Sequence, residues 1–190
     1  MSALSLIALA RRHAGALISM AARRATVEEL TLERLRATGA WAVILDHDGV
    51  LGPNMSERPD ETGMALIRRA LDAFGPGKVF ILSNTRRRRA VRSAFFATVP
   101  GVTYLIAERK PDPDGLRQAS RLAGVSADRI AVVDDGPLTG GLMAITSGAI
   151  PVYAIRSSMA ESPAAFLIRQ LTTLPQRAVI RLLALGARGQ

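Results

Sequence analysis

Two carboxylates follow directly on an apolar run, and this arrangement limits the folds that the chain can adopt. Residues 41–45 read Trp-Ala-Val-Ile-Leu, and Asp46-His47-Asp48-Gly49 comes next. A continuous apolar run of this length is typical of a parallel-sheet strand that is buried on both faces. Open α/β sheets bind their ligands outside the carboxyl ends of their strands. The sequence therefore predicts that Asp46 and Asp48 lie at the ligand-binding edge of such a sheet.

Short apolar runs and segments with helical periodicity alternate along the chain from residue 41. Strands are predicted at residues 41–46, 78–82, 102–106, 130–133 and 150–155, and helices at residues 61–74, 86–97, 112–123 and 139–147. This alternation predicts an α/β fold with a doubly wound, mostly parallel sheet that is flanked by helices. The loop before the helix at 61–74 is short, so we expect a capless domain with an open site.

The first 40 residues precede this pattern. We expect residues 1–40 to form a basic helical appendage to a core that spans residues 41–190. Residues 2–24 are predicted to be helical and basic. A second helix is predicted from an N-cap at Thr26 through Arg36, because acidic residues in its first turn would complement the helix dipole.

The charge balance indicates an anionic partner. The 190 residues carry a formal net charge of +9, and four arginines precede the first acidic residue, Glu28. Residues 1–25 are compatible with a transit peptide or with a basic amphipathic helix on a membrane surface, and the lack of an evident cleavage signal favours the helix. The tail from Ser162 is expected to be helical, with an interruption at Pro175. Its apolar face would pack on the sheet or dock on anionic lipid.

Composition excludes several classes of function. The chain has no cysteine, which excludes disulfides, thiolate nucleophiles and cysteine-rich zinc sites. Aromatic residues make up 4 % of the chain and are not interleaved with basic ones, so a nucleic-acid partner is not expected. No apolar run reaches the roughly 18–20 residues that a membrane span needs.

Polar residues that are able to take part in catalysis or ligand binding follow the predicted strands. They are Asp46 and Asp48, Ser83 and Asn84, Lys110, and Asp134 and Asp135. Strand ends of a parallel sheet converge on one edge, so these side chains are expected to meet there. Phosphoryl transfer needs a nucleophile, a cation that neutralises the phosphate oxygens, and a proton donor for the leaving alcohol. Together the motifs offer all three.

In this order the motifs resemble those of the haloacid dehalogenase superfamily of phosphatases, over about residues 41–155. They resemble its phosphatidylglycerophosphate phosphatase branch more closely, through Thr26, Glu28 and Leu30, the Arg109-Lys110-Pro111 motif, Thr139 and a basic C-terminal helix. The resemblance implies a Mg²⁺-dependent phosphomonoester hydrolase that converts phosphatidylglycerophosphate to phosphatidylglycerol through an aspartyl-phosphate. Its partners would be a phosphorylated lipid head group and an anionic membrane surface.

The same resemblance implies a location and a role for each strand-end residue. The protein would be cytoplasmic and peripheral to the inner membrane face, or in an organellar matrix if the N-terminus is a transit peptide. Asp46 would be the nucleophile, and Asp48 would protonate the leaving oxygen and then activate water. Lys110 would offset the negative charge of the phosphate. Ser83 would bind a phosphoryl oxygen, with Asn84 orienting the group.

Mg²⁺ prefers oxygen ligands, and the resemblance implies that Asp46, Asp135 and the main-chain carbonyl of Asp48 supply them. The family pattern has another acid where this chain has Gly140. We expect Asp134 to compensate by holding the metal or a water, with weaker Mg²⁺ binding as the consequence.

Four consecutive arginines, residues 86–89, follow the second strand end. They form either a solvated face or an anion clamp, since arginine forks bind phosphate, and Arg86 is our candidate for substrate binding. His47 is expected to face away from the site, because alternate strand residues point to opposite sides. Two alternatives stay open: a phosphatase for a soluble phosphate or phosphoprotein, and a weakly active protein that binds membranes or anions.

Overall fold

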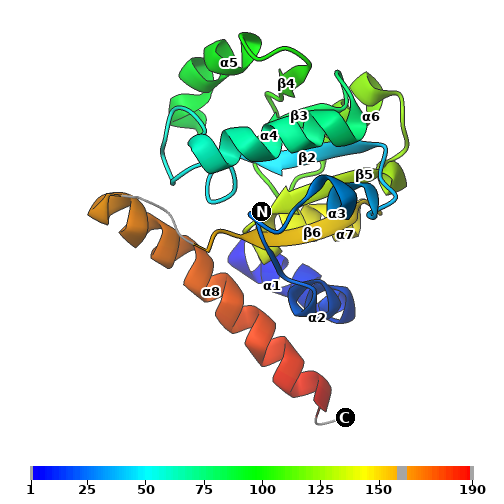
Figure 1. Ribbon diagram of the computed structural model, residues 1–190. Helices are drawn as coiled ribbons and strands as arrows, with labels where there is room; N and C mark the ends of the chain where they lie inside the picture. Colours follow the sequence, from blue (N-terminus) through cyan, green and yellow to red (C-terminus); the bar gives the residue numbers. More distant parts are fainter. Residues whose placement is uncertain (1, 158–161, 189–190) are drawn as a thin grey trace.

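The computed structural model describes residues 2–157 and 162–188, and within them helices flank a six-stranded sheet (Figure 1). The strands are β1 (Ala25–Thr26), β2 (Ala42–Asp46), β3 (Val79–Leu82), β4 (Val102–Tyr104), β5 (Ile130–Asp134) and β6 (Ile150–Ile155). Their order is β1-β6-β5-β2-β3-β4, and every neighbouring pair is parallel. This confirms the predicted doubly wound α/β fold.

Helices cover both faces of the sheet. They are α1 (Ala3–Arg12), α2 (Ala14–Ala22), α3 (Leu32–Arg36), α4 (Glu61–Phe74), α5 (Arg89–Ala97), α6 (Asp114–Ala123), α7 (Leu142–Thr146) and α8 (Pro163–Arg188), with short helical turns at Arg86–Arg88, Ala127–Arg129 and Pro137–Gly141. Core residues of α3, α4 and α5 pack on one face of the sheet, and those of α6 and α7 pack on the other.

Strand β2 shows how the sequence produces this layering. Val43 and Leu45 belong to the cluster under α4, whereas Ala42 and Ile44 belong to the cluster under α6. Successive strand residues point to opposite faces, so a strand that is apolar at every position is buried from both sides. The polar residue that ends it, Asp46, therefore emerges at the edge of the sheet.

The segment from Thr26 to Arg36 is not the single helix that the sequence predicted. Ala25 and Thr26 form β1 and pair with Ala154 and Ile155 of β6. Helix α3 begins only at Leu32, after an N-cap at Thr31. The ladder with β6 satisfies backbone groups that the first turn of a helix would leave unpaired, which explains the extended start. The division of the chain at residue 40 stays a prediction.

Helix α8 runs without a break through Pro175, where an interruption was predicted. Thr173 and Ile180, on either side of this proline, are both buried against the rest of the molecule, and this packing holds the two halves of the helix in line. Helix α8 packs against α2, and in Figure 1 its C-terminal part extends beyond the body of the protein. Among the described residues, no helix combines the length and hydropathy that crossing a membrane requires.

Candidate active site

A cavity of about 390 Å³ lies at the carboxyl ends of β2, β3 and β5. Its lining residues are Asp46, Asp48, Asn54, Met55, Asn84, Thr85, Arg109, Lys110, Asp135, Gly136, Thr139, Ile168, Thr172, Thr173 and Gln176. The strand ends thus bring together residues that are far apart in the sequence. The last four belong to α8, so the C-terminal helix forms one wall of the cavity.

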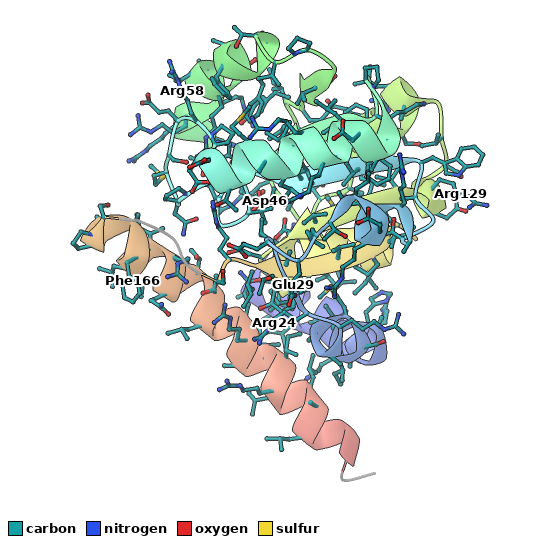
Figure 2. All side chains as sticks on the ribbon, in the orientation of Figure 1. Arg24, Glu29, Asp46, Arg58, Arg129 and Phe166 are labelled. Atoms are coloured by element: carbon teal, nitrogen blue, oxygen red, sulfur yellow. The ribbon has the colours of Figure 1, made fainter. Side chains whose placement is uncertain are left out.

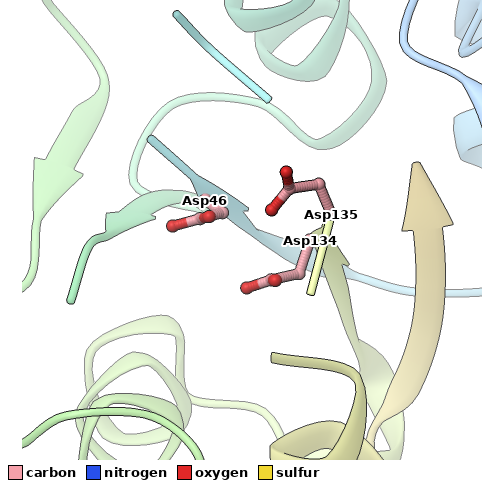
Figure 3. Close-up of side chains that lie close together, drawn as sticks. All are labelled: Asp46, Asp134 and Asp135. Carbon is pink, nitrogen blue, oxygen red and sulfur yellow. The ribbon is translucent and has the colours of Figure 1, made fainter. Parts of the chain in front are cut away.

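Three carboxylates lie close together at this site (Figure 3), and two of them, Asp46 and Asp135, line the cavity. Asp46, Asp134 and Asp135 each place an oxygen within 4.8 Å of the others. Lys110 Nζ donates to Asp46 Oδ1 at 2.7 Å and to Asp134 Oδ2 at 2.6 Å. Burial alone would lower the pKa of Lys110, but Asp134 and Asp46 outweigh burial and raise it. One ammonium group is therefore shared by two of the three carboxylates.

The charges in this cluster do not balance, and this imbalance suits a metal ion. Burial raises the pKa of Asp46 well above its ordinary range, despite the nearby Lys110. Burial and the negative charge of Asp134 raise the pKa of Asp135 to about 7. A cation among these oxygens would remove the repulsion that disfavours their ionised forms. The donors are carboxylate oxygens, which Mg²⁺ prefers, so the residues present fit such an ion.

Two glycines make room for the carboxylates. A Cβ atom at Gly140 would lie 2.0 Å from Asp134 Oδ2, and one at Gly49 would lie 2.1 Å from Asp135 Oδ2. The carboxylate of Asp134 therefore occupies the space into which any side chain at position 140 would project. The acid at position 134 and the glycine at position 140 are thus sterically coupled. That Asp134 compensates for the missing acid stays a prediction.

Asp48 is held by a buried arginine that the sequence did not single out. Arg92 of α5 is fully buried, and its Nη1 and Nη2 each donate to one oxygen of Asp48 at 2.8 Å. Ser83 Oγ and Thr85 Oγ1 also donate to Asp48, at 2.8 and 2.9 Å, as does the backbone N–H of Met55 at 2.9 Å. Asp48 is therefore fixed by several donors at once.

These donors stabilise the ionised form of Asp48. Burial works to raise its pKa, yet the hydrogen bonds and positive charge of Arg92 outweigh burial and hold the pKa well below the usual aspartate range. In this arrangement Asp48 is a carboxylate at neutral pH. It is thus ready to accept a proton, and it must loosen its contact with Arg92 before it can donate one.

The predicted substrate-binding residues have different surroundings. Ser83 is buried and bridges Arg92 and Asp48. The side chain of Asn84 lines the cavity, and its Oδ1 accepts a hydrogen bond from the backbone N–H of Lys110 at 2.8 Å. Arg86 is exposed and pairs with Glu108 at 3.1 Å, and it lines a neighbouring cavity rather than the acidic one.

His47 lies away from the carboxylate cluster. It is completely buried and packs edge-on against Phe96, with ring centroids 6.0 Å apart. Neither ring nitrogen hydrogen bonds to any residue in the part of the chain that the structure describes. Burial, with the positive charge of Arg92, lowers the pKa of His47 to about 3, so it is a neutral core residue.

Comparison with known proteins adds one distant structural likeness. Neither a protein-family model nor a curated protein matches this chain. A HAD family hydrolase from Deinococcus radiodurans R1, solved with bound phosphate and sodium, has a TM-score of 0.43 and 17 % identity, over 70 % of this chain and 88 % of that one. A likeness at this level carries no argument about chemistry. The α/β fold follows from the observed strand order, and the candidate site follows from its own residues.

Proposed function

We propose that this protein is a Mg²⁺-dependent phosphomonoester hydrolase of the haloacid dehalogenase type, with Asp46 as its nucleophile. One observation carries this proposal: Asp46 lines an open cavity beside the ammonium group of Lys110 and two further carboxylates. Phosphoryl transfer requires such a carboxylate together with positive charge for the phosphate oxygens. Asp46 and Asp135 would hold the ion, which would supply part of that positive charge.

The reaction has two steps. In the first, a carboxylate oxygen of Asp46 attacks phosphorus, the bond to the ester oxygen breaks, and the leaving oxygen takes a proton from Asp48. Asp48 must be protonated for this step, which requires that its contact with Arg92 loosens. In the second, water attacks the aspartyl-phosphate and releases phosphate and free Asp46. Asp48 takes the proton of this water as general base, a role that matches its ionised state. Lys110 remains an ammonium group and faces the phosphate throughout.

The proposed substrate is phosphatidylglycerophosphate, held at an anionic membrane surface. Helix α8 supports this choice, because it lines the cavity on one side and exposes apolar side chains on another. Figure 2 shows Phe166 near the start of this helix. The exposed apolar residues of α8 are Phe166, Leu167, Ile168, Leu171, Leu174, Leu182 and Leu185. Its described residues include arginines and no acidic residue, as an interfacial helix on anionic lipid requires.

An assay of phosphate release tests the activity and the substrate together. The purified full chain should release phosphate from phosphatidylglycerophosphate in mixed micelles with Mg²⁺, and not with excess EDTA. Glycerol 3-phosphate, a nucleoside monophosphate and a phosphoserine peptide form the comparison panel. Turnover of a soluble phosphate but not of the lipid would overturn the substrate alone. No turnover of any phosphomonoester at millimolar Mg²⁺ would overturn the activity.

Replacing two exposed leucines of α8 with serine should weaken membrane binding. Leu171 and Leu174 are 67 % and 53 % exposed, and burying each in lipid is worth about 1.5 kcal/mol or more. The double variant should therefore bind anionic vesicles about 100-fold less tightly in a sedimentation assay. Leu122→Ser on α6, where the leucine is 63 % exposed, is the matched control. Unchanged vesicle binding by the double variant would contradict a docking role for α8.

A further inference from the structure

A second cavity, of about 210 Å³, adjoins the acidic site. Arg156, Arg169 and Arg177 line it, and Asp135 lines both this cavity and the first one. Arg156 directly follows β6, and the other two arginines lie on α8. Three arginines and one carboxylate thus line a small space, so the lining favours an anionic ligand. We call this space the arginine cavity.

The side chain of Arg156 is almost completely buried. Its side chain is only 3 % exposed, and one of its terminal nitrogens pairs with Asp60 Oδ1 at 2.7 Å. Its Nε and Nη1 are buried, and among the described residues neither finds a hydrogen-bond acceptor; the same holds for Nε of Arg177. Leaving a buried charged donor without an acceptor is costly. Two of the arginines that line the cavity thus carry donors that no described residue satisfies.

The chemistry of the lining indicates what the ligand is. Arginine presents a planar fork of donors that matches phosphate oxygens in pairs, and such charge-assisted hydrogen bonds are short and strong. A cavity of about 210 Å³ has room for one phosphate group and a few waters.

We infer that the arginine cavity binds a phosphate-type oxyanion beside the catalytic carboxylates. This binding is independent of turnover. Its meaning for substrate choice rests on the proposed function: a substrate that carries a phosphodiester near its phosphomonoester would place the second phosphate here. The alternative ligand is free inorganic phosphate, which presents the same oxygens to the arginine cavity.

Phosphate binding is measured first, by calorimetry on the full chain in EDTA, with inorganic phosphate as the probe. Arg177→Gln should weaken binding at least about tenfold, because one fork of donors is lost. Arg156→Gln serves as a second variant, and the unfolding temperature of each variant shows whether it is folded. Arg121→Gln, at an exposed arginine of α6, is the matched control and should bind as the wild type does. Wild-type affinity in both cavity variants would overturn the inference.

Kinetics then distinguish the two sources of phosphate. Glycerophosphoglycerophosphate carries a phosphodiester and a phosphomonoester, whereas glycerol 3-phosphate carries a phosphomonoester only. If the substrate fills the cavity, Arg177→Gln should raise KM for the first compound and leave KM for the second unchanged. If free phosphate fills it, KM for both should stay the same while phosphate binding is lost. A protein without phosphatase activity could still bind phosphate here, so the two proposals can fail separately.

Discussion

Asp46→Asn is expected to lower phosphate release by about a thousandfold or more, because the covalent route through an aspartyl-phosphate is lost. Asn keeps the size of Asp46 and its hydrogen-bonding capacity toward Lys110, whose Nζ lies 2.7 Å from Asp46 Oδ1. The variant should therefore retain the shape of the cavity while lacking the nucleophile. Steady-state and single-turnover phosphate release with saturating Mg²⁺ measure the loss.

A chemical signature separates loss of the nucleophile from simple damage to the fold. The wild type, quenched with acid during turnover, should carry a phosphoryl group that hydroxylamine removes, as an acyl phosphate does, and Asp46→Asn should carry none. Asp128→Asn replaces an exposed acid at the turn before β5 and should behave as the wild type in both assays. Turnover by Asp46→Asn above a tenth of the wild-type rate would contradict the mechanism.

Stability gives a further control for this substitution. Burial raises the pKa of Asp46 above its ordinary range, so its folded pKa exceeds its unfolded pKa. A carboxyl group whose pKa is higher in the folded state makes the protein less stable as pH rises above the pKa in the unfolded state, about 3.9. In EDTA at neutral pH, Asp46→Asn should therefore unfold at the same temperature as the wild type or at a higher one. Activity would then fall while stability stays the same or rises.

The features that the sequence predicted well are those with a local signal. The apolar run that becomes β2 ends in Asp46 at the predicted place, and the spacing of apolar residues predicted α4 with the bounds that the structure shows. The expected strand ends also converge, because a parallel sheet aligns its carboxyl ends at one edge. Lys110 and the acidic residues meet there, although they lie on different elements.

The features that the sequence did not predict depend on contacts between distant segments. Nothing in the sequence distinguishes Arg92 from the four arginines before it, but only α5 packing over Ser56 and Asp48 buries it. The wall that α8 adds to the cavity likewise depends on how the tail packs. Thr26 and Glu29 do exchange capping hydrogen bonds. Only a turn follows them, however, since the pairing of Thr26 with β6 outweighs the local helical preference.

Arg92→Met is expected to destabilise the fold by about 3–5 kcal/mol at pH 7, because removing one partner of a buried ion pair leaves the other charge buried without compensation. Asp48, whose side chain is 16 % exposed, would lose both guanidinium hydrogen bonds and keep its charge. The backbone carbonyl of Ser56 would also lose its Arg92 donors. Urea unfolding monitored by circular dichroism measures the change. Arg87→Met replaces an exposed arginine of the run at residues 86–89 and should lower the stability far less.

The pH dependence of this loss identifies Asp48 as its origin. Arg92 holds the folded pKa of Asp48 below its unfolded value, so the pair stabilises the wild type above about pH 4 and less as pH falls. Without Arg92, burial would raise that pKa, and the charge on Asp48 would then destabilise the variant as pH rises. The stability gap between the two proteins, measured in EDTA, should therefore widen from pH 4 to pH 7. A gap that is the same at both values would mean that Arg92 stabilises the fold by packing alone.

The same substitution shows what Arg92 contributes to turnover. By keeping Asp48 ionised, Arg92 favours its action as the base for water and disfavours its action as the acid for the leaving alcohol. Arg92→Lys keeps the positive charge but loses the paired fork of donors, so the pKa of Asp48 should rise and the acidic limb of the pH–rate profile should move to higher pH. A residue that only supports the fold would lower the rate at every pH and leave that limb in place. A shift of the limb in Arg92→Lys, without a change in Arg87→Met, would establish that Arg92 sets the protonation state of Asp48.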